Sequence, residues 1–329
     1  MSTITVLHLK KYYRVHQKEP GLIGTFKSLV ARKFYDVPAV DDISFSIKEG
    51  ELIGFIGPNG AGKTTTLKCL SGLLYPTSGE VNVLGFTPQG RNPAFLKQIA
   101  LVMGQKNQLW WDLPPMETFL LNKEIYEIPQ TEFQKTLDDL TKLLAIKDLV
   151  NVPVRKLSLG ERMKCELIAA LLHNPKVLFL DEPTIGLDVV MQKAIRDFIA
   201  AYNMKYKATI ILTSHYMEDV KQLCKRVIII DKGKLLFDGE LSSIVERFAP
   251  EKLLSVTFDE HVNVRDLGKI GDVREFNFPH AVIAVDRDKT SRQAAKLLEH
   301  FSVDDVNIEE PDIEDIIRKV FTDKKVILQ

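Results

Sequence analysis

Short apolar runs alternate along this chain with longer segments in which apolar residues recur every three or four positions. Continuous apolar runs, typical of buried strands, occur at 52–56, 177–180, 208–212 and 227–230. Helical spacing fills stretches between them, for example 161–172 and 191–202. Because strands and helices alternate, the pattern predicts an α/β fold with a mostly parallel, wound sheet.

Two further regions have a different pattern. Apolar residues at helical spacing from 117 to 148 predict a helical insertion, which we place at about 106–170. After Gly239 the pattern changes to strands at 253–258, 274–278 and 281–285 and helices at 291–300 and 313–321. We therefore predict two domains, a large one at 1–243 and a small α/β domain at 244–329 whose folded part begins near Pro250.

The stretch between Tyr13 and Val40 carries apolar residues at helical spacing with basic residues between them. This pattern predicts a short basic amphipathic helix. Two interpretations stay open, a surface helix folded back onto the large domain or a helix that contacts lipid headgroups or a membrane partner.

Composition indicates a globular protein with a large core, because 45% of the 329 residues are hydrophobic and 27% are charged. Lys plus Arg and Asp plus Glu number 44 each, so no overall field favours nucleic acid or an anionic membrane. Three widely spaced cysteines, Cys69, Cys165 and Cys224, predict buried free thiols in a reducing compartment. No apolar run reaches the ~20 residues of a membrane span, and the first residues form no signal peptide, so we expect a cytosolic chain.

Residues 57–64 read Gly-Pro-Asn-Gly-Ala-Gly-Lys-Thr and lie between a predicted strand and a predicted helix. This is the phosphate-loop pattern, in which glycines let backbone N–H groups face phosphates at a helix N-terminus. Lys63 is expected to reach the β- and γ-phosphates, and the Thr64 hydroxyl to bind Mg²⁺. The predicted nucleotide-binding residues are Gly57, Asn59, Gly60, Ala61, Gly62, Lys63, Thr64 and Thr65.

Two adjacent carboxylates, Asp181 and Glu182, follow the apolar run at 177–180. Ligands of open α/β sheets bind at the carboxyl ends of strands. We therefore predict that Asp181 orients Mg²⁺ and that Glu182 polarises the attacking water. Such acids are also common as helix caps, and the phosphate loop favours the catalytic interpretation.

The segment Leu-Ser-Leu-Gly-Glu at 157–161 precedes a predicted helix. By itself it predicts a capping box, with Ser158 at the N-cap and Glu161 three residues later.

The order of these motifs resembles the ATP-binding subunit of ABC transporters over about residues 1–243. The resemblance rests on the phosphate loop, Gly104-Gln105, the 157–161 segment, Asp181-Glu182-Pro183-Thr184, Gly186-Leu187-Asp188 and Thr213-Ser214-His215. It implies a P-loop NTPase core with a parallel-rich sheet, an antiparallel β-subdomain and an inserted helical subdomain. The small C-terminal α/β domain lies beyond the resemblance.

Several roles follow from the resemblance alone. It implies a head-to-tail dimer in which Ser158, Gly160 and Glu161 of one subunit contact the nucleotide on the phosphate loop of the other. It also implies that Gln105 senses Mg²⁺ and reports to the transport partner. In the same way, Asp188 couples the two sites, and His215 acts beside Glu182 by holding the γ-phosphate and the water.

An aromatic residue stacks on adenine in the family, and Tyr13 matches its spacing. Tyr12 is a competing candidate, and ordinary partial burial is the alternative for either tyrosine.

This chain departs from the usual family pattern at three places. Leu159 stands where the family has a glycine, Glu161 where it has a glutamine, and residues 14–39 form a longer link than usual. These features resemble the bacterial drug and antibiotic exporter branch, although importers also keep their ATPases on separate chains.

We therefore expect a Mg²⁺-dependent ATPase that drives a separately encoded membrane permease from the inner face of the membrane. A homodimer is expected, a heterodimer stays open, and nucleic acid is not an expected partner. The alternatives are a soluble relative that acts on ribosomes or DNA, and an unrelated phosphate-loop GTPase. Trp110 and Trp111 are either core or subdomain-junction residues, or the contact with the permease.

Overall fold

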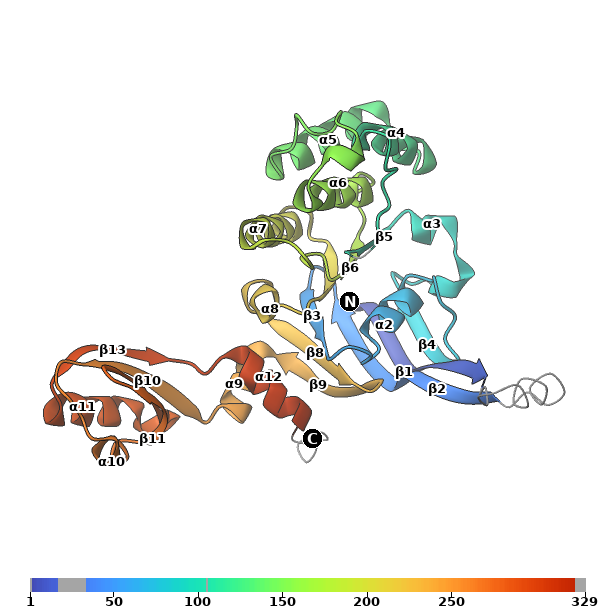
Figure 1. Cartoon of the computed structure of the whole chain (residues 1–329). Helices are drawn as coiled ribbons and strands as arrows, with labels where there is room; N and C mark the ends of the chain where they lie inside the picture. The colour runs from blue at the N-terminus through green and yellow to red at the C-terminus, as the bar shows by residue number, and fades with distance from the viewer. Residues whose placement is uncertain (1, 17–33, 105, 323–329) are drawn as a thin grey trace, which may run out of the picture. The chain divides into compact units, whose positions relative to one another are not determined.

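The computed structural model describes residues 2–16, 34–104 and 106–322. The chain divides into two compact units, Met1–Asp238 and Gly239–Gln329, and each has a hydrophobic core of its own (Figure 1).

Unit 1 is built on a six-stranded sheet of order β5-β6-β7-β3-β8-β9. Its strands are β3 (Leu52–Ile56), β5 (Ile99–Met103), β6 (Val177–Asp181), β7 (Thr209–Thr213), β8 (Arg226–Asp231) and β9 (Lys234–Glu240). The neighbours β5 and β6, β6 and β7, β7 and β3, and β3 and β8 all pair in parallel. Every residue of β6 and β7 is buried, which explains why these strands are continuous apolar runs in the sequence. The predicted parallel-rich α/β core is confirmed.

A second, antiparallel sheet of order β2-β1-β4 lies in the same unit. Its strands are β1 (Ser2–His16), β2 (Phe34–Lys48) and β4 (Ser78–Val83). Phe34, which we expected on a helix, pairs with His16, so both ends of the 14–39 segment extend β1 and β2 as a ribbon. The aromatic and β-branched residues there favour extended backbone, and the helical spacing was read too far in both directions. The predicted helix itself falls on residues 17–33, outside the described residues.

Helices complete unit 1, namely α2 (Lys63–Leu70), α3 (Pro93–Leu96), α4 (Pro115–Ile125), α5 (Gln130–Leu143), α6 (Leu159–Leu171), α7 (Val189–Tyr206) and α8 (Met217–Leu223), with the 3-10 turns η1 (Pro88–Gly90) and η2 (Val154–Lys156). Between β5 and β6, the helices α4, α5 and α6 gather at the top of the unit in Figure 1. Their own buried side chains include Phe119, Phe133 and Leu140. The predicted helical insertion is confirmed.

Unit 2 has a four-stranded antiparallel sheet of order β11-β12-β10-β13. Its elements are α9 (Leu241–Phe248), β10 (Glu251–Phe258), α10 (Val264–Leu267), β11 (Asp272–Asn277), β12 (His280–Asp286), η3 (Arg287–Lys289), α11 (Thr290–His300), β13 (Val303–Glu309) and α12 (Ile313–Thr322). From β10 to β13 the strands and α-helices follow the β-α-β-β-α-β order of a ferredoxin-like motif. The sequence predicted three of the four strands but not β13, whose exposed polar residues hide its alternation.

All three cysteines are free and buried, as predicted. Burial raises the pKa of the Cys69 thiol to about 11 and that of Cys165 to about 12, so both are protonated at neutral pH. Across residues 2–16, 34–104 and 106–322, no helix combines the length and apolar character needed to cross a bilayer.

Candidate nucleotide-binding site

The phosphate loop connects β3 to α2, and two of its glycines, Gly57 and Gly62, stand where a side chain would collide with backbone. A Cβ on Gly57 would lie 2.2 Å from the Ile230 carbonyl oxygen, and one on Gly62 would lie 2.4 Å from that of Ala39. Gly62 also has a φ of 108°, a backbone conformation that favours glycine. Neighbouring segments therefore fix the loop from both sides, and its tip at Asn59 and Gly60 is exposed.

Lys63 begins α2 and is only 5% exposed. Its Nζ donates hydrogen bonds to the carbonyl oxygens of Gly57 at 2.7 Å and Pro58 at 3.2 Å. Burial lowers the pKa of Lys63, whereas the carboxylates of Glu182 and Asp181 act to raise it. The ammonium group is thus folded against the loop and faces two acidic residues, where phosphate oxygens are its natural ligands.

Asp181 ends β6 and links three elements through hydrogen bonds. Its Oδ2 accepts from the Thr64 hydroxyl at 2.8 Å, and its Oδ1 accepts from the Thr213 hydroxyl at 2.7 Å. Hydroxyl and carboxylate oxygens of α2 and β6 are therefore adjacent beside the loop. Oxygen donors of this kind are the ligands that Mg²⁺ takes, so the residues present fit the predicted metal.

Glu182 has a φ of 56°, which is uncommon for a residue with a side chain. Its N–H donates to the backbone and side-chain oxygens of Thr213, both at 3.1 Å. Its Oε1 lies 2.7 Å from Nε2 of His215. The two residues predicted to act on the attacking water are thus in direct contact, and backbone strain is typical of such sites.

A buried network behind this pair was not predicted from the sequence. Asp219 on α8 is fully buried and accepts hydrogen bonds from Thr184, Ser214 and Arg196. It therefore connects the turn after Glu182, the residue before His215, and α7. The sequence shows only an acidic residue between the apolar runs at 208–212 and 227–230, which by itself favours no particular partner.

Ser158 is exposed and forms the predicted capping box at the start of α6. Its N–H donates to Glu161 Oε2 at 2.8 Å, and its Oγ accepts from the Glu161 N–H at 3.3 Å. Thr65, which was also predicted to bind nucleotide, lies in the first turn of α2 and not on the Ser158 turn.

The Ser158 turn packs against the turn that begins α7. A Cβ on Gly160 would lie 2.6 Å from the Met191 side chain, and one on Gly186 would lie 3.3 Å from Leu159. Asp188 caps α7, with Oδ1 accepting from the Met191 N–H at 2.9 Å. The site residues therefore form two groups, one at the phosphate loop and one on these two turns.

Tyr12 and Tyr13 lie on β1, opposite the part of β2 that supports the phosphate loop. Their partners on β2 are Pro38 and Val37, next to Ala39, whose carbonyl group contacts Gly62. The Tyr12 hydroxyl donates to Asp41 at 2.6 Å, and that bond raises the pKa of Tyr12. Tyr13 is 41% exposed.

Gln105 lies outside the described residues. Trp110 and Trp111 are each 52% exposed, which excludes the interpretation that they are core residues.

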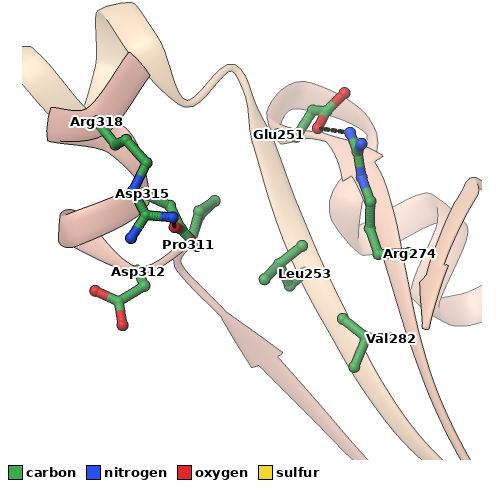
Figure 2. A pocket seen from close by; sticks show the side chains of 8 residues that line it. All are labelled: Glu251, Leu253, Arg274, Val282, Pro311, Asp312, Asp315 and Arg318. Carbon is green, nitrogen blue, oxygen red and sulfur yellow. Dashed lines mark hydrogen bonds and ion pairs between the residues drawn. The ribbon is translucent and has the colours of Figure 1, made fainter. Parts of the chain in front are cut away.

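Unit 2 contains a separate hollow of about 450 Å³, shown in Figure 2. Its floor includes Leu253 and Val282, and Arg274 and Arg318 stand on its rim. Arg274 pairs with Glu251 at 2.8 Å, and Arg318 pairs with Asp315 at 3.2 Å. Both guanidinium groups are engaged by carboxylates of this chain, and no residue predicted for catalysis lines the hollow.

Two protein-family models match the chain. The model described as ABC transporter matches residues 40–185, and the model described as EvrA-like ABC transporter, C-terminal domain, matches residues 250–309.

Curated relatives include the ABC transporter ATP-binding protein NatA of Bacillus subtilis (strain 168), 36% identical over 68% of this chain and 92% of that protein. The linearmycin resistance ATP-binding protein LnrL of the same organism is 30% identical over 84% of this chain and 91% of that protein. The methionine import ATP-binding protein MetN of Geobacillus kaustophilus (strain HTA426) is 35% identical over 62% of this chain and 61% of that protein.

Solved structures share the fold. An ATP-binding subunit of an ABC transporter superposes with a TM-score of 0.62 at 23% identity, over 75% of this chain and 93% of that one. A dimeric ATP-binding cassette, MJ0796, bound to ADP and Pi superposes with a TM-score of 0.60 at 22% identity, over 72% of this chain and 98% of that one. Three findings agree: the identity and coverage of the curated relatives, the matched family model and the phosphate-loop geometry. This chain therefore belongs to the ATP-binding proteins of ABC transporters, and unit 1 is its ATP-binding and ATP-hydrolysing domain.

Proposed function

We propose that this protein is the Mg²⁺-dependent ATPase motor of an exporter and works as a dimer on a separate membrane permease. One observation carries the proposal. Lys63, Asp181 and Glu182 beside the phosphate loop are buried and hydrogen-bonded, whereas Ser158, Leu159 and Asp188 are solvent-exposed. A second copy would bring its own Ser158 turn to the nucleotide on the first.

Nucleotide binding rests on unit 1 alone. Backbone N–H groups of residues 57–64 and the start of α2 provide a site for phosphate oxygens, and Lys63 adds a positive charge. Thr64 and Asp181 would hold Mg²⁺, with Gln105 as the third predicted ligand. When bound, the ion supplies charge neutralisation on the β- and γ-phosphate oxygens. Tyr13 is the proposed adenine platform because it is exposed, whereas the Tyr12 hydroxyl is bonded to Asp41.

Hydrolysis is assigned to the contact between Glu182 and His215. Glu182 orients the attacking water and accepts its proton, as a carboxylate close to the reacting phosphate can. His215 holds the Glu182 carboxylate through the 2.7 Å contact and is placed to donate to the γ-phosphate. Asp219 keeps the chain segments on either side of the pair in position.

The proposed dimer closes the second half of the site. Ser158 and Gly160 would approach the γ-phosphate held by the other copy, where the N-terminus of α6 favours negative charge. Asp188, on the adjoining turn, would connect the two sites. Val189 and Val190 follow it and are each 76% exposed, an apolar surface suited to burial between copies.

The permease contact is assigned to Trp110 and Trp111, since exposed tryptophans commonly mark interaction surfaces. Export is supported by resistance and antibiotic-transport relatives, LnrL and the bacitracin transport protein BcrA of Bacillus licheniformis. Such a complex would hold the chain at the inner face of the membrane. The zero net charge is consistent with a protein that does not bind nucleic acid.

Co-purification tests the partner. The chain should bring down a polytopic membrane protein, and replacement of both tryptophans by alanine should abolish the capture without reducing basal ATPase activity. Leu298, also 52% exposed but in unit 2, supplies the matched control Leu298→Ala, which should leave capture unchanged. Capture of ribosomes or DNA instead would contradict the transport function.

A further inference from the structure

A buried carboxylate joins the segment at 108–113 to helix α6. Glu166 is 4% exposed, and its Oε1 accepts the N–H groups of Gln108 at 2.8 Å and Leu109 at 3.1 Å. Both donors belong to the two residues directly before Trp110. The acceptor lies two turns along α6 from Ser158, which is about 12 Å at the rise of an α-helix.

The same segment is also bonded to the turn that precedes Ser158. The Trp111 carbonyl oxygen accepts the Arg155 N–H at 2.9 Å, and the Leu113 carbonyl oxygen accepts the Val154 N–H at 3.1 Å. Arg155 forms an ion pair with Asp112 at 3.0 Å. These bonds form one continuous connection from the tryptophans to η2, two residues before Ser158.

A contact on α6 itself adds to this connection. The guanidinium group of Arg162 lies 5.4 Å from the ring centroid of Trp111. Trp111 therefore contacts the first turns of the helix that Ser158 caps. Glu166, farther along that helix, accepts the N–H of Leu109, two positions before Trp111.

We propose that Glu166 is a positioning residue that makes 108–113 and the Ser158 turn move as one body. A displacement of the two tryptophans would then reach Ser158 directly, without passing through the central sheet. This inference rests on the proposed function, because it assumes that a partner moves the tryptophans and that Ser158 closes a second site.

The choice of a carboxylate at this position supports the proposal. Burial raises the pKa of Glu166, although the two N–H bonds act to lower it, so keeping a charge here is unfavourable. Among the described residues its Oε2 has no hydrogen-bond partner, so the bonds to Gln108 and Leu109 and the nearby positive charge of Arg162 are what offset that cost. A residue needed only for packing would be apolar.

The test compares Glu166→Leu with Glu166→Gln in the full chain. Leucine fills similar space but removes the acceptor, whereas glutamine keeps an oxygen that can accept both N–H groups. Amide hydrogen exchange is measured along the whole chain. With leucine, we expect exchange to rise by about tenfold both at 108–109 and at 154–158, because two buried donors lose their acceptor and the connection loosens. Glutamine should restore both regions to within about twofold, since its oxygen keeps the bonds.

A merely local role would give a different result. If Glu166→Leu raises exchange at 108–109 and leaves 154–158 unchanged, the two regions do not move together and the proposal is wrong. Arg155→Ala, which removes only an exposed ion pair and cannot unfold the core, should raise exchange at 154–158 by a smaller factor. No change there would also count against the connection.

A second readout separates this inference from the proposed function. In a Glu182→Gln background, ATP-induced dimer formation and the ATP affinity of the monomer are measured with and without Glu166→Leu. We expect unchanged ATP affinity and about tenfold weaker dimerisation, because the Ser158 turn is no longer held. If the parent never dimerises, the proposed function fails, and the exchange result still decides the role of Glu166. If parent and variant dimerise equally, Glu166 does not position Ser158.

Discussion

The two groups of site residues in unit 1 differ in how much of their burial and hydrogen bonding one chain provides. Lys63, Asp181 and Glu182 are at most 9% exposed and bond to neighbours on four segments of the core. At the Ser158 and Asp188 turns, Leu159 is 39% exposed and Val189 is 76% exposed. There, the polar groups bond mainly within their own turns, as helix caps.

This difference indicates that the folded single chain already holds the phosphate-loop residues in place. The phosphate-loop half is held in place by the parallel sheet, and it needs no partner to keep its geometry. The Ser158 half is a surface, and its exposed apolar residues gain from burial only against another molecule. The proposed sandwich of two copies would give these exposed residues a partner.

The largest effect is expected from Glu182→Gln, which removes the proton acceptor of the buried half. The turnover number should fall by roughly 100- to 10,000-fold, the range for loss of a general base. Glutamine preserves the shape of the side chain, so ATP affinity should stay close to that of the parent. Steady-state hydrolysis together with equilibrium ATP binding checks both. Turnover like that of the parent would refute the assigned role.

The next effect comes from Ser158→Asp, with Ser158→Asn as its matched control. Both substitutes are good N-caps, but only asparagine can still donate to the Glu161 carboxylate, as the Ser158 hydroxyl does at 2.9 Å. The free energy of unfolding should therefore change by less than about 0.5 kcal/mol with asparagine and fall by up to about 1 kcal/mol with aspartate. Aspartate, however, would place a negative charge against the γ-phosphate of the opposing copy. We expect it to weaken ATP-induced dimerisation by about 10- to 100-fold, whereas asparagine should weaken it only slightly. Dimerisation is measured by light scattering. Equal dimerisation of the two variants would show that Ser158 does not lie at the interface.

The smallest effect concerns His173, a partly buried residue just after α6. Burial lowers the pKa of His173 below its ordinary value, and the hydrogen bond to the Ile99 carbonyl only partly opposes this. The unfolded chain therefore takes up a proton at higher pH than the folded chain, so stability falls as pH drops below about 6.5.

The variant His173→Gln can keep a donor for Ile99 but cannot titrate. It should lose less stability than the parent between pH 7 and pH 5, measured as the change in urea midpoint. Parallel losses in the two proteins would show that His173 does not contribute to acid sensitivity. Dimerisation through Ser158 should not respond to this substitution.

The proximity of Lys63, Thr64, Asp181 and Glu182 could be predicted from the sequence because their motifs are local in the chain. Residues 57–64 and the pair Asp181-Glu182 occupy short motifs next to apolar strands, and parallel strands bring their carboxyl ends together. The central sheet was predictable for the same reason, since β6 and β7 are buried on both faces.

Other features depend on contacts between distant residues and were not predictable. Asp219 and Glu166 are acidic residues within helical patterns, and nothing in their neighbourhood in the sequence shows that they are buried. Apart from Ser214, which is five positions from Asp219, their partners lie 23 to 58 positions away. The extension of β1 and β2 by residues at the two ends of the 14–39 segment was also missed, because its aromatic residues fit helical spacing as well as strand alternation.

A mixing experiment tests the central claim most directly. Lys63→Ala disables the phosphate loop, and Ser158→Asp disables the opposite half, so each protein alone should have almost no ATPase activity. If the site is shared between copies, a mixed dimer contains one site with both halves intact, and activity should reappear on mixing. If each chain forms a complete site by itself, no intact site exists in the mixture, and activity that stays at the sum of the two variants would contradict the account.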